Sequence, residues 1–261
     1  MDLCRDAAIC TCSKSLGVAG TSARILAAVA QAAEVKEKPP LYTYVANFTI
    51  PRARWGDMDK QVATDDKIMD KAVADGTLVA YGNDVNVIHQ DDTDTHDFFW
   101  SAMSMAGVLK ALENITGSAG TSVLSSATKH SDNLFVSRFY NWHAGSLKGA
   151  YTHGASYKLK ADAPDDAVET ISKSFVVPLM EKALADGVVS EYEVDEEAIH
   201  TEAPGTFWIY YICPRADGLD KVNAALAAAF KEQPLAGSAL GSMVDLSAHR
   251  DQLATTNAVY K

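Results

Sequence analysis

Hydrophobic side chains follow two alternating patterns along the chain from residue 41 onward. Residues 41–48 (LYTYVANF) are rich in aromatic and β-branched side chains, which is typical of a β-strand. Apolar residues then recur at helical spacing between Trp55 and Val73, and Asp75-Gly76 offers a glycine to end that helix. The pattern that follows predicts strands at 78–89, 98–102 and 134–140 and a helix at 108–115.

The same series of elements occurs a second time. Ile68–Gly76 (IMDKAVADG) reappears in the second half of the chain as Leu179–Gly187 (LMEKALADG). Four further blocks keep the same order at a similar separation: Tyr42-Thr43 with Tyr151-Thr152, Ile88-His89 with Ile199-His200, Gly107–Lys110 with Gly218–Lys221, and His130–Leu134 with His249–Leu253. Small changes in separation are what loop insertions produce, so the blocks indicate an internal duplication.

We therefore predict two repeats, 39–148 and 149–261, preceded by a tail or degraded signal segment at 1–38. In the second repeat the pattern predicts strands at 151–158, 188–194, 207–213 and 254–260 and helices at 168–185 and 219–230. Pro178 lies inside the first of these helices and should kink or split it, because proline lacks the N–H of the helical ladder.

The order β-α-β-β-α-β is that of a ferredoxin-like unit, in which both helices cover one face of a sheet. The other face must also be covered, and in a duplicated chain the sheet of the second repeat is the natural cover. Element order and duplication over residues 41–261 resemble the dimeric α/β-barrel (ferredoxin-like) superfamily. The resemblance implies an α+β fold: two tandem ferredoxin-like βαββαβ repeats whose four-stranded antiparallel sheets pack into a single-chain dimeric α/β barrel.

Composition and charge narrow the class of partner. The chain is 48% hydrophobic and 22% charged, as soluble globular proteins are. It carries 23 basic and 34 acidic residues, a net charge of −11, which argues against non-specific binding to nucleic acid or to anionic lipid. No apolar run is long enough to predict a membrane span. We expect no nucleic acid and no membrane as partners; a small-molecule ligand fits, and the pseudo-dimer is compatible with a monomer or a homo-oligomer.

The segment at 1–38 leaves the location of the protein open. Ala30–Ala32 follows a short apolar run and resembles a signal-peptidase site. Asp2 and Arg24 are atypical of an export signal, so periplasmic or secreted and cytoplasmic locations both stay open. Cys213 lies in a strand-like run, where we expect a buried small hydrophobe rather than a nucleophile.

Four of the seven histidines occupy equivalent places in the two repeats. The candidate catalytic residues are His89, His200, Tyr81 and Tyr192, and the candidate ligand-binding residues are His130, His249, Asp132 and Asp251. A Tyr and a His on one sheet face can polarise an enol or carbonyl group. Because edge strands of different repeats should meet, His89 is expected near His249, and His200 near His130. The alternative is that these residues form turns and strand ends with a structural role.

Other chemistry has little support in the sequence. No dinucleotide-binding, phosphate-loop, esterase-nucleophile or zinc-protease motif is present, and we expect no cofactor and no metal site. Two acidic stretches, at 91–97 and 191–197, are predicted to be a solvated turn and a solvated sheet edge.

Three functional hypotheses remain, since fold alone does not fix function. The superfamily that the chain resembles includes cofactor-free monooxygenases, isomerases and decarboxylases, haem proteins and ligand-binding regulators. The first hypothesis is a small-molecule-binding barrel protein, a cofactor-independent oxygenase or isomerase with pockets between sheet and helices. The second is a non-catalytic binding or stress-related protein with structural histidines. The third is a haem or metal protein, which the lack of an evident histidine in the predicted helices disfavours.

Overall fold

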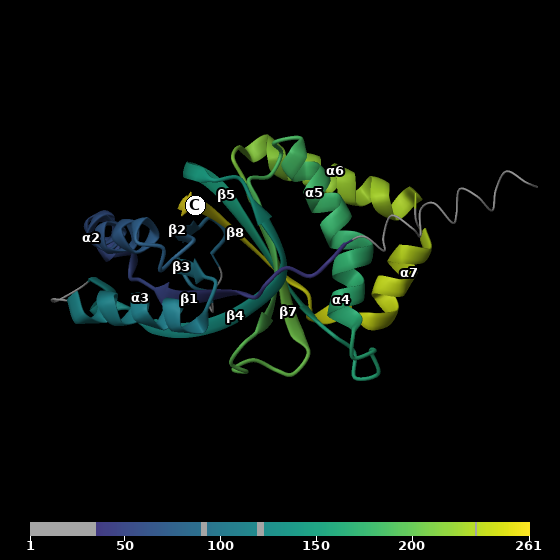
Figure 1. The fold of residues 1–261 in the computed structure, drawn as a ribbon, viewed down its shortest axis with the longest axis horizontal. Coiled ribbons are helices and arrows are strands. Elements are labelled where there is room, and N and C mark those ends of the chain that lie inside the picture. Colours follow the sequence, from purple (N-terminus) through teal and green to yellow (C-terminus); the bar gives the residue numbers. More distant parts are fainter. Residues whose placement is uncertain (1–34, 90–92, 119–122, 233) are drawn as a thin grey trace, which may run out of the picture. The chain divides into compact units, whose positions relative to one another are not determined.

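The computed structural model describes residues 35–89, 93–118, 123–232 and 234–261, so the predicted tail and its export signal lie almost wholly outside the described residues. Within them, eight strands form one closed antiparallel barrel (Figure 1). The first repeat supplies β1 (Leu41–Thr49), β2 (Ala80–Asn86), β3 (His96–Ala102) and β4 (Lys129–Trp142). The second repeat supplies β5 (Gly145–Lys158), β6 (Glu191–Glu197), β7 (Thr206–Cys213) and β8 (Arg250–Tyr260).

The strand order around the barrel is β1-β3-β2-β8-β5-β7-β6-β4. Each repeat therefore forms a four-stranded antiparallel sheet with its first and third strands in the centre. Two seams join the sheets, β2 to β8 and β4 to β6, and both are antiparallel ladders. This topology confirms the predicted α+β barrel of two ferredoxin-like repeats. The repeat boundary predicted at 148/149 falls inside β5.

The helices form two groups, one for each sheet (Figure 1). The group of the first repeat comprises α2 (Trp55–Ala74) and α3 (Met105–Ser118). The group of the second comprises α4 (Ala167–Ile171), α5 (Val177–Ala185), α6 (Ala216–Glu232) and α7 (Pro234–Met243). Burial of Met58, Met69 and Ala72 along one stripe of α2 holds that helix on its sheet. None of the helices in the described part of the chain is long and apolar enough to cross a membrane.

The predicted helix at 168–185 is split, as Pro178 implied. A π-helical turn, Ser172–Val176, separates α4 from α5, and Pro178 lies in the first turn of α5. Proline has no N–H to donate and its ring crowds the preceding turn, so the hydrogen-bond ladder widens just before it. Helix α7 was not predicted, because its sequence PLAGSALGSM contains few large apolar residues at helical spacing.

Both faces of each sheet are covered. Along β1, Tyr44, Ala46 and Phe48 face the helices, whereas Thr43 and Val45 face the barrel interior. On the helix side Tyr44 stacks on Trp100 with ring centroids 4.6 Å apart. Cys213, at the end of β7, is fully buried, which confirms its predicted place in the core.

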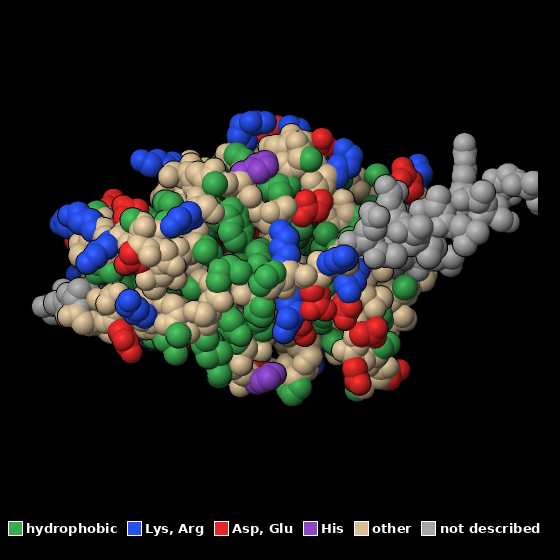
Figure 2. Space-filling model, in the orientation of Figure 1, with side chains coloured by type: hydrophobic (Ala, Val, Ile, Leu, Met, Phe, Trp, Pro, Cys, Tyr) green, Lys and Arg blue, Asp and Glu red, His purple; other side chains and the backbone are tan. Residues whose placement is uncertain are grey.

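Charged side chains of both signs lie mainly over the helices and loops in Figure 2, and apolar side chains gather across the middle of the face shown there. This surface is consistent with the acidic but mixed composition of the chain.

Candidate binding cavities

Two equivalent cavities lie between the sheets and their helices. The cavity of the first repeat has a volume of about 590 Å³, and that of the second about 260 Å³. We call them the first and second cavities. Their walls correspond through the duplication: Tyr44 with His153, Phe48 with Tyr157, Trp100 with Tyr211, His130 with His249, and Asp132 with Asp251. The duplication therefore preserved a cavity, and not only a fold.

One wall of the first cavity carries a histidine–carboxylate pair. His130 and Asp132 are two residues apart on β4, so their side chains share one face of the strand. The His130 Nε2 lies 3.0 Å from Asp132 Oδ1, and the imidazole stacks on Phe48 at 4.3 Å. Burial raises the pKa of Tyr44 above its ordinary value, and the charge of Asp132 and a hydrogen bond to it add to this effect. Asp132 thus interacts with both an imidazole and a phenol.

The second cavity repeats this arrangement with different residues. His249 Nε2 lies 3.1 Å from Asp251 Oδ1 and His153 Nε2 lies 3.5 Å from the same oxygen. Burial lowers the pKa of His153. The stacked pair Phe175 and Phe230, 4.7 Å apart, occupies this cavity, and Phe175 stands where the first repeat has Thr64. The phenylalanine ring at position 175 occupies more space in this cavity than a threonine would.

Sequence reasoning overlooked His153 and Tyr44. The signal was present, because the match of Tyr42-Thr43 with Tyr151-Thr152 also aligns Tyr44 with His153, two polar aromatic residues.

The candidate tyrosines each bind a carboxylate of the first helix of their repeat. Tyr81 donates a hydrogen bond of 2.7 Å to Asp70, and Tyr192 donates one of 2.7 Å to Glu181. These partners are themselves equivalent, because Asp70 and Glu181 follow the matched Met69 and Met180. Tyr81 also lines the first cavity, whereas Tyr192 is buried and is absent from the lining of the second. Both tyrosines fix a helix to the second strand of its sheet.

His89 and His200 lie apart from both cavities. Each is exposed and stands three residues beyond the end of β2 or β6. The ring of His89 packs 5.4 Å from that of Trp55. The seams bring β2 beside β8 and β4 beside β6, as the hypothesis of shared sites requires, but neither histidine lines either cavity. Among the described residues no three His, Cys, Asp or Glu side chains are grouped as metal ligands.

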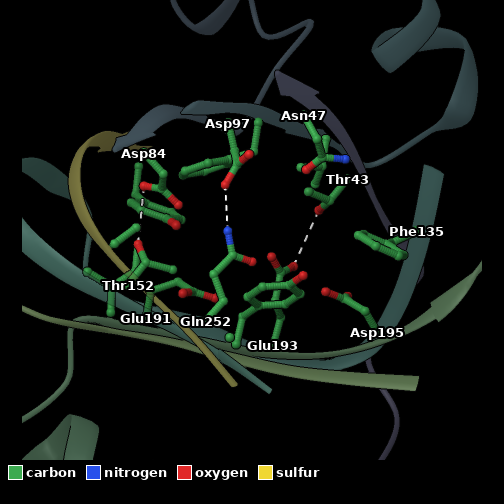
Figure 3. Close-up of a pocket in the computed structure, with 17 residues that line it drawn as sticks. Thr43, Asn47, Asp84, Asp97, Phe135, Thr152, Glu191, Glu193, Asp195 and Gln252 are labelled. Atoms are coloured by element: carbon green, nitrogen blue, oxygen red, sulfur yellow. Dashed lines mark hydrogen bonds between the residues drawn. The ribbon is translucent and has the colours of Figure 1, made fainter. Parts of the chain in front are cut away.

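A third cavity, of about 50 Å³, lies inside the barrel and is lined by carboxyl groups (Figure 3). Asp84 comes from β2, Asp97 from β3, and Glu191, Glu193 and Asp195 from alternate positions of β6. The prediction of a solvated edge at 191–197 is wrong for these three residues, and the predicted solvated turn at 91–97 is wrong for Asp97. The acidic face of β6 points inward because its other face, with Tyr192 and Val194, packs toward the helices.

Neutral hydrogen-bond donors hold some of these carboxyls. Thr152 Oγ1 donates to Asp84 at 3.3 Å, Gln252 Nε2 donates to Asp97 at 2.7 Å, and Thr43 Oγ1 donates to Glu193 at 3.3 Å, as the dashed lines in Figure 3 show. No Lys, Arg or His occurs among the described residues that line this cavity.

Burial is therefore the main influence on the pKa values of the carboxyl groups inside the barrel. It raises the pKa of Asp84 to about 6 and that of Glu193 to about 7. The pKa values of Asp97, Glu191 and Asp195 rise well above the usual range for the same reason, with repulsion from the neighbouring carboxyls adding to the effect. The interior thus holds protons at pH values where exposed carboxyls have lost them.

No protein-family model matches the sequence, and no curated protein matches it. Solved structures do. A protein from Lactobacillus acidophilus NCFM described as a "putative monooxygenase" has a TM-score of 0.62 and 10% sequence identity, with 85% of this chain and 97% of that one covered. A second "putative monooxygenase", from Fusobacterium nucleatum subsp. nucleatum, has a TM-score of 0.55, 5% identity and coverage of 86% and 95%.

An anthrone oxidase-like protein has a TM-score of 0.51 and 11% identity, with 84% of this chain and 92% of that one covered. The chain has the dimeric α/β-barrel fold. At identities of 5 to 11% the likeness to these three structures concerns the fold alone. The dimeric α/β barrel here is formed within one chain, as the duplication predicted.

Proposed function

We propose that the protein binds a small aromatic molecule in the first cavity and transfers a proton there, as a cofactor-independent oxygenase or isomerase does. The observation that carries this proposal is a 590 Å³ cavity with the His130–Asp132 pair in its wall. Cavities of this size hold drug-sized ligands, with mostly apolar walls and a few placed polar groups. The rings of Phe48, Phe98 and Trp100 supply flat apolar walls for an aromatic ligand.

His130 is the proton acceptor in this proposal. Its Nε2 lies 3.0 Å from Asp132 Oδ1, and with the proton of the neutral ring on Nε2 the lone pair on Nδ1 is available to take a proton. A ligand with an acidic CH₂ that is attached to an aromatic ring and conjugated through that ring with a carbonyl would lose one proton of the CH₂ to the imidazole. Return of the proton to another carbon completes an isomerisation. Reaction of the carbanion with O₂ completes an oxygenation, in which one CH₂ and one O₂ yield one C=O and one water.

Proteins with a similar fold support this choice. One of them is described as an anthrone oxidase-like protein, and two are each described as a "putative monooxygenase". A haem-binding role has less support, because the sequences of α2 and α3, the helices over the first cavity, contain no histidine to serve as an axial ligand.

Anthrone is a suitable probe, since it is aromatic and has an acidic CH₂ beside its rings. Quenching of tryptophan fluorescence reports binding near Trp100, and O₂ uptake with anthraquinone formation reports turnover. We expect His130→Gln to reduce turnover by about 100-fold or more, as loss of a general base does. The matched control is His143→Gln, because His143 is exposed in the turn between β4 and β5.

Turnover by His130→Gln at the wild-type rate would contradict the catalytic role. Binding of anthrone without conversion in any variant would favour the non-catalytic binding protein instead. If anthrone neither quenches fluorescence nor turns over, the proposed ligand class is wrong.

A further inference from the structure

The cavity inside the barrel contains buried carboxylate oxygens without partners. Asp195 is 0% exposed, and neither Oδ1 nor Oδ2 has a hydrogen-bond partner among the described residues. Asp97 is 5% exposed and its Oδ1 is likewise without one. In Figure 3 the Asp195 carboxylate points into the cavity, toward Glu193. Unpaired buried carboxylates are costly, so such groups either keep a proton or meet a cation.

Aromatic rings share the cavity with these carboxyls. Phe99, Phe135 and Tyr210 line it, and the ring of Tyr210 also passes within 2.4 Å of the point where a Cβ on Gly154 would lie. Glycine at position 154 is therefore what gives the Tyr210 ring its place in the interior. Carboxylates combined with aromatic faces form the environment that recognises organic ammonium groups, through ion pairs and cation–π contacts.

A cavity of about 230 Å³, which we call the vestibule, adjoins the interior cavity, because Gly154, Tyr210 and Gln252 line both. Ile88 and Trp208 contribute apolar surface to the vestibule, and Arg250 also lines it. The interior by itself admits only a group of a few atoms, whereas the two spaces together admit such a group with a short chain attached.

We propose that the barrel interior binds the ammonium group of a small primary amine, paired with the Asp195 carboxylate, and that the vestibule holds the carbon chain of the amine. Figure 3 shows carboxyls on opposite walls of this space, and an ammonium group has three diverging N–H donors that can be directed to different walls. A directly ligated metal ion fits less well, because no three carboxyl groups of the described residues are grouped as metal ligands. The site is separate from the first cavity and does not depend on the proposed function.

Calorimetric titration at pH 8 with n-butylamine tests the proposal, with 1-butanol, KCl and MgCl₂ as comparison solutes. We expect saturable binding of one n-butylamine per chain and no binding of 1-butanol, which has the same length and no charge. Asp195→Asn should weaken the binding by at least about tenfold, since it removes an ion pair worth roughly 1.4 kcal/mol or more.

Glu196→Gln is the matched control, because Glu196 is the next residue of β6 and is exposed on the other face of the strand. It should bind n-butylamine as the wild type does. Glu193→Gln serves as a second test inside the cavity if Asp195→Asn fails to fold, and should also weaken binding. Equal binding of 1-butanol, unchanged affinity in the interior variants, or displacement of the amine by equimolar MgCl₂ would each overturn the proposal.

Discussion

Replacement of Asp84 by asparagine should make the stability of the protein less dependent on pH. Asp84 lies on β2 inside the barrel and accepts a hydrogen bond from Thr152, so the amide fits the same space. Burial raises the pKa of its carboxyl from the usual 3.8 to about 6. Between these values the folded protein keeps a proton that the unfolded chain has lost. The contribution of the protonated Asp84 carboxyl to the free energy of unfolding is therefore complete below pH 3.8, and it is lost as the pH rises through 6.

The magnitude follows from the two pKa values. Ionising Asp84 in the folded protein costs about 3 kcal/mol, at about 1.4 kcal/mol for each tenfold change in proton affinity. The groups that face it across the interior are Asp97 on β3, Glu191 on β6, Tyr210 on β7 and Tyr260 on β8. These groups are neutral or acidic, and none supplies a positive charge. As the pH rises from 4 to 8, the free energy of unfolding of Asp84→Asn should therefore increase by about 3 kcal/mol relative to that of the wild type.

Urea unfolding at pH 4, 5, 6, 7 and 8, followed by circular dichroism in the absence of amines, measures this difference. Asp162→Asn is the control, because Asp162 is exposed in the turn after β5. If the free energies of unfolding of the wild type and Asp84→Asn change with pH in parallel, Asp84 is not a buried carboxyl that keeps its proton in the folded protein.

Two further substitutions, Gly82→Ala with Gly56→Ala as its control and Tyr192→Phe, test the packing of the protein by urea unfolding at a fixed pH. Gly82→Ala should destabilise the protein by about 1–3 kcal/mol, because the new Cβ would lie 2.8 Å from the Asn257 carbonyl oxygen and 2.5 Å from the Phe99 ring. Gly56→Ala, with no atom within 4 Å, should be neutral or stabilising by up to about 1 kcal/mol, and equal losses in both would disprove the close approach. Tyr192→Phe should cost about 1.5–3 kcal/mol, because it removes a 2.7 Å hydrogen bond to the Glu181 carboxylate. A loss below about 0.5 kcal/mol would show that this bond contributes little to holding α5 on its sheet.

The duplication made most of the fold predictable. The repeated blocks made β2 the counterpart of β6 and α3 the counterpart of α6, and the closed barrel followed from the expectation that the face of each sheet turned away from its helices must also be covered. Pro178 correctly indicated a divided helix. Helix α7 escaped prediction because small residues carry almost no periodic signal.

The acidic interior was not predictable from the usual meaning of strand patterns. In Glu191–Asp195 acidic and apolar residues alternate strictly, which ordinarily indicates one solvated and one buried face. Here helices cover the apolar face and the opposing sheet covers the acidic one, so both are buried. The stacking of Phe48 on His130 and of Tyr157 on His249 was also not predictable, because the two partners of each pair lie on strands that are far apart in the sequence. The roles of His89 and His200 stay predictions.

The unequal cavities show what covalent fusion permits. In a barrel assembled from two identical chains, every substitution occurs twice, so both pockets must change together. Here a phenylalanine enters one pocket at position 175 while threonine remains at position 64 in the other. In a single chain, therefore, a mutation can make one cavity smaller and leave the equivalent cavity of the other repeat unchanged.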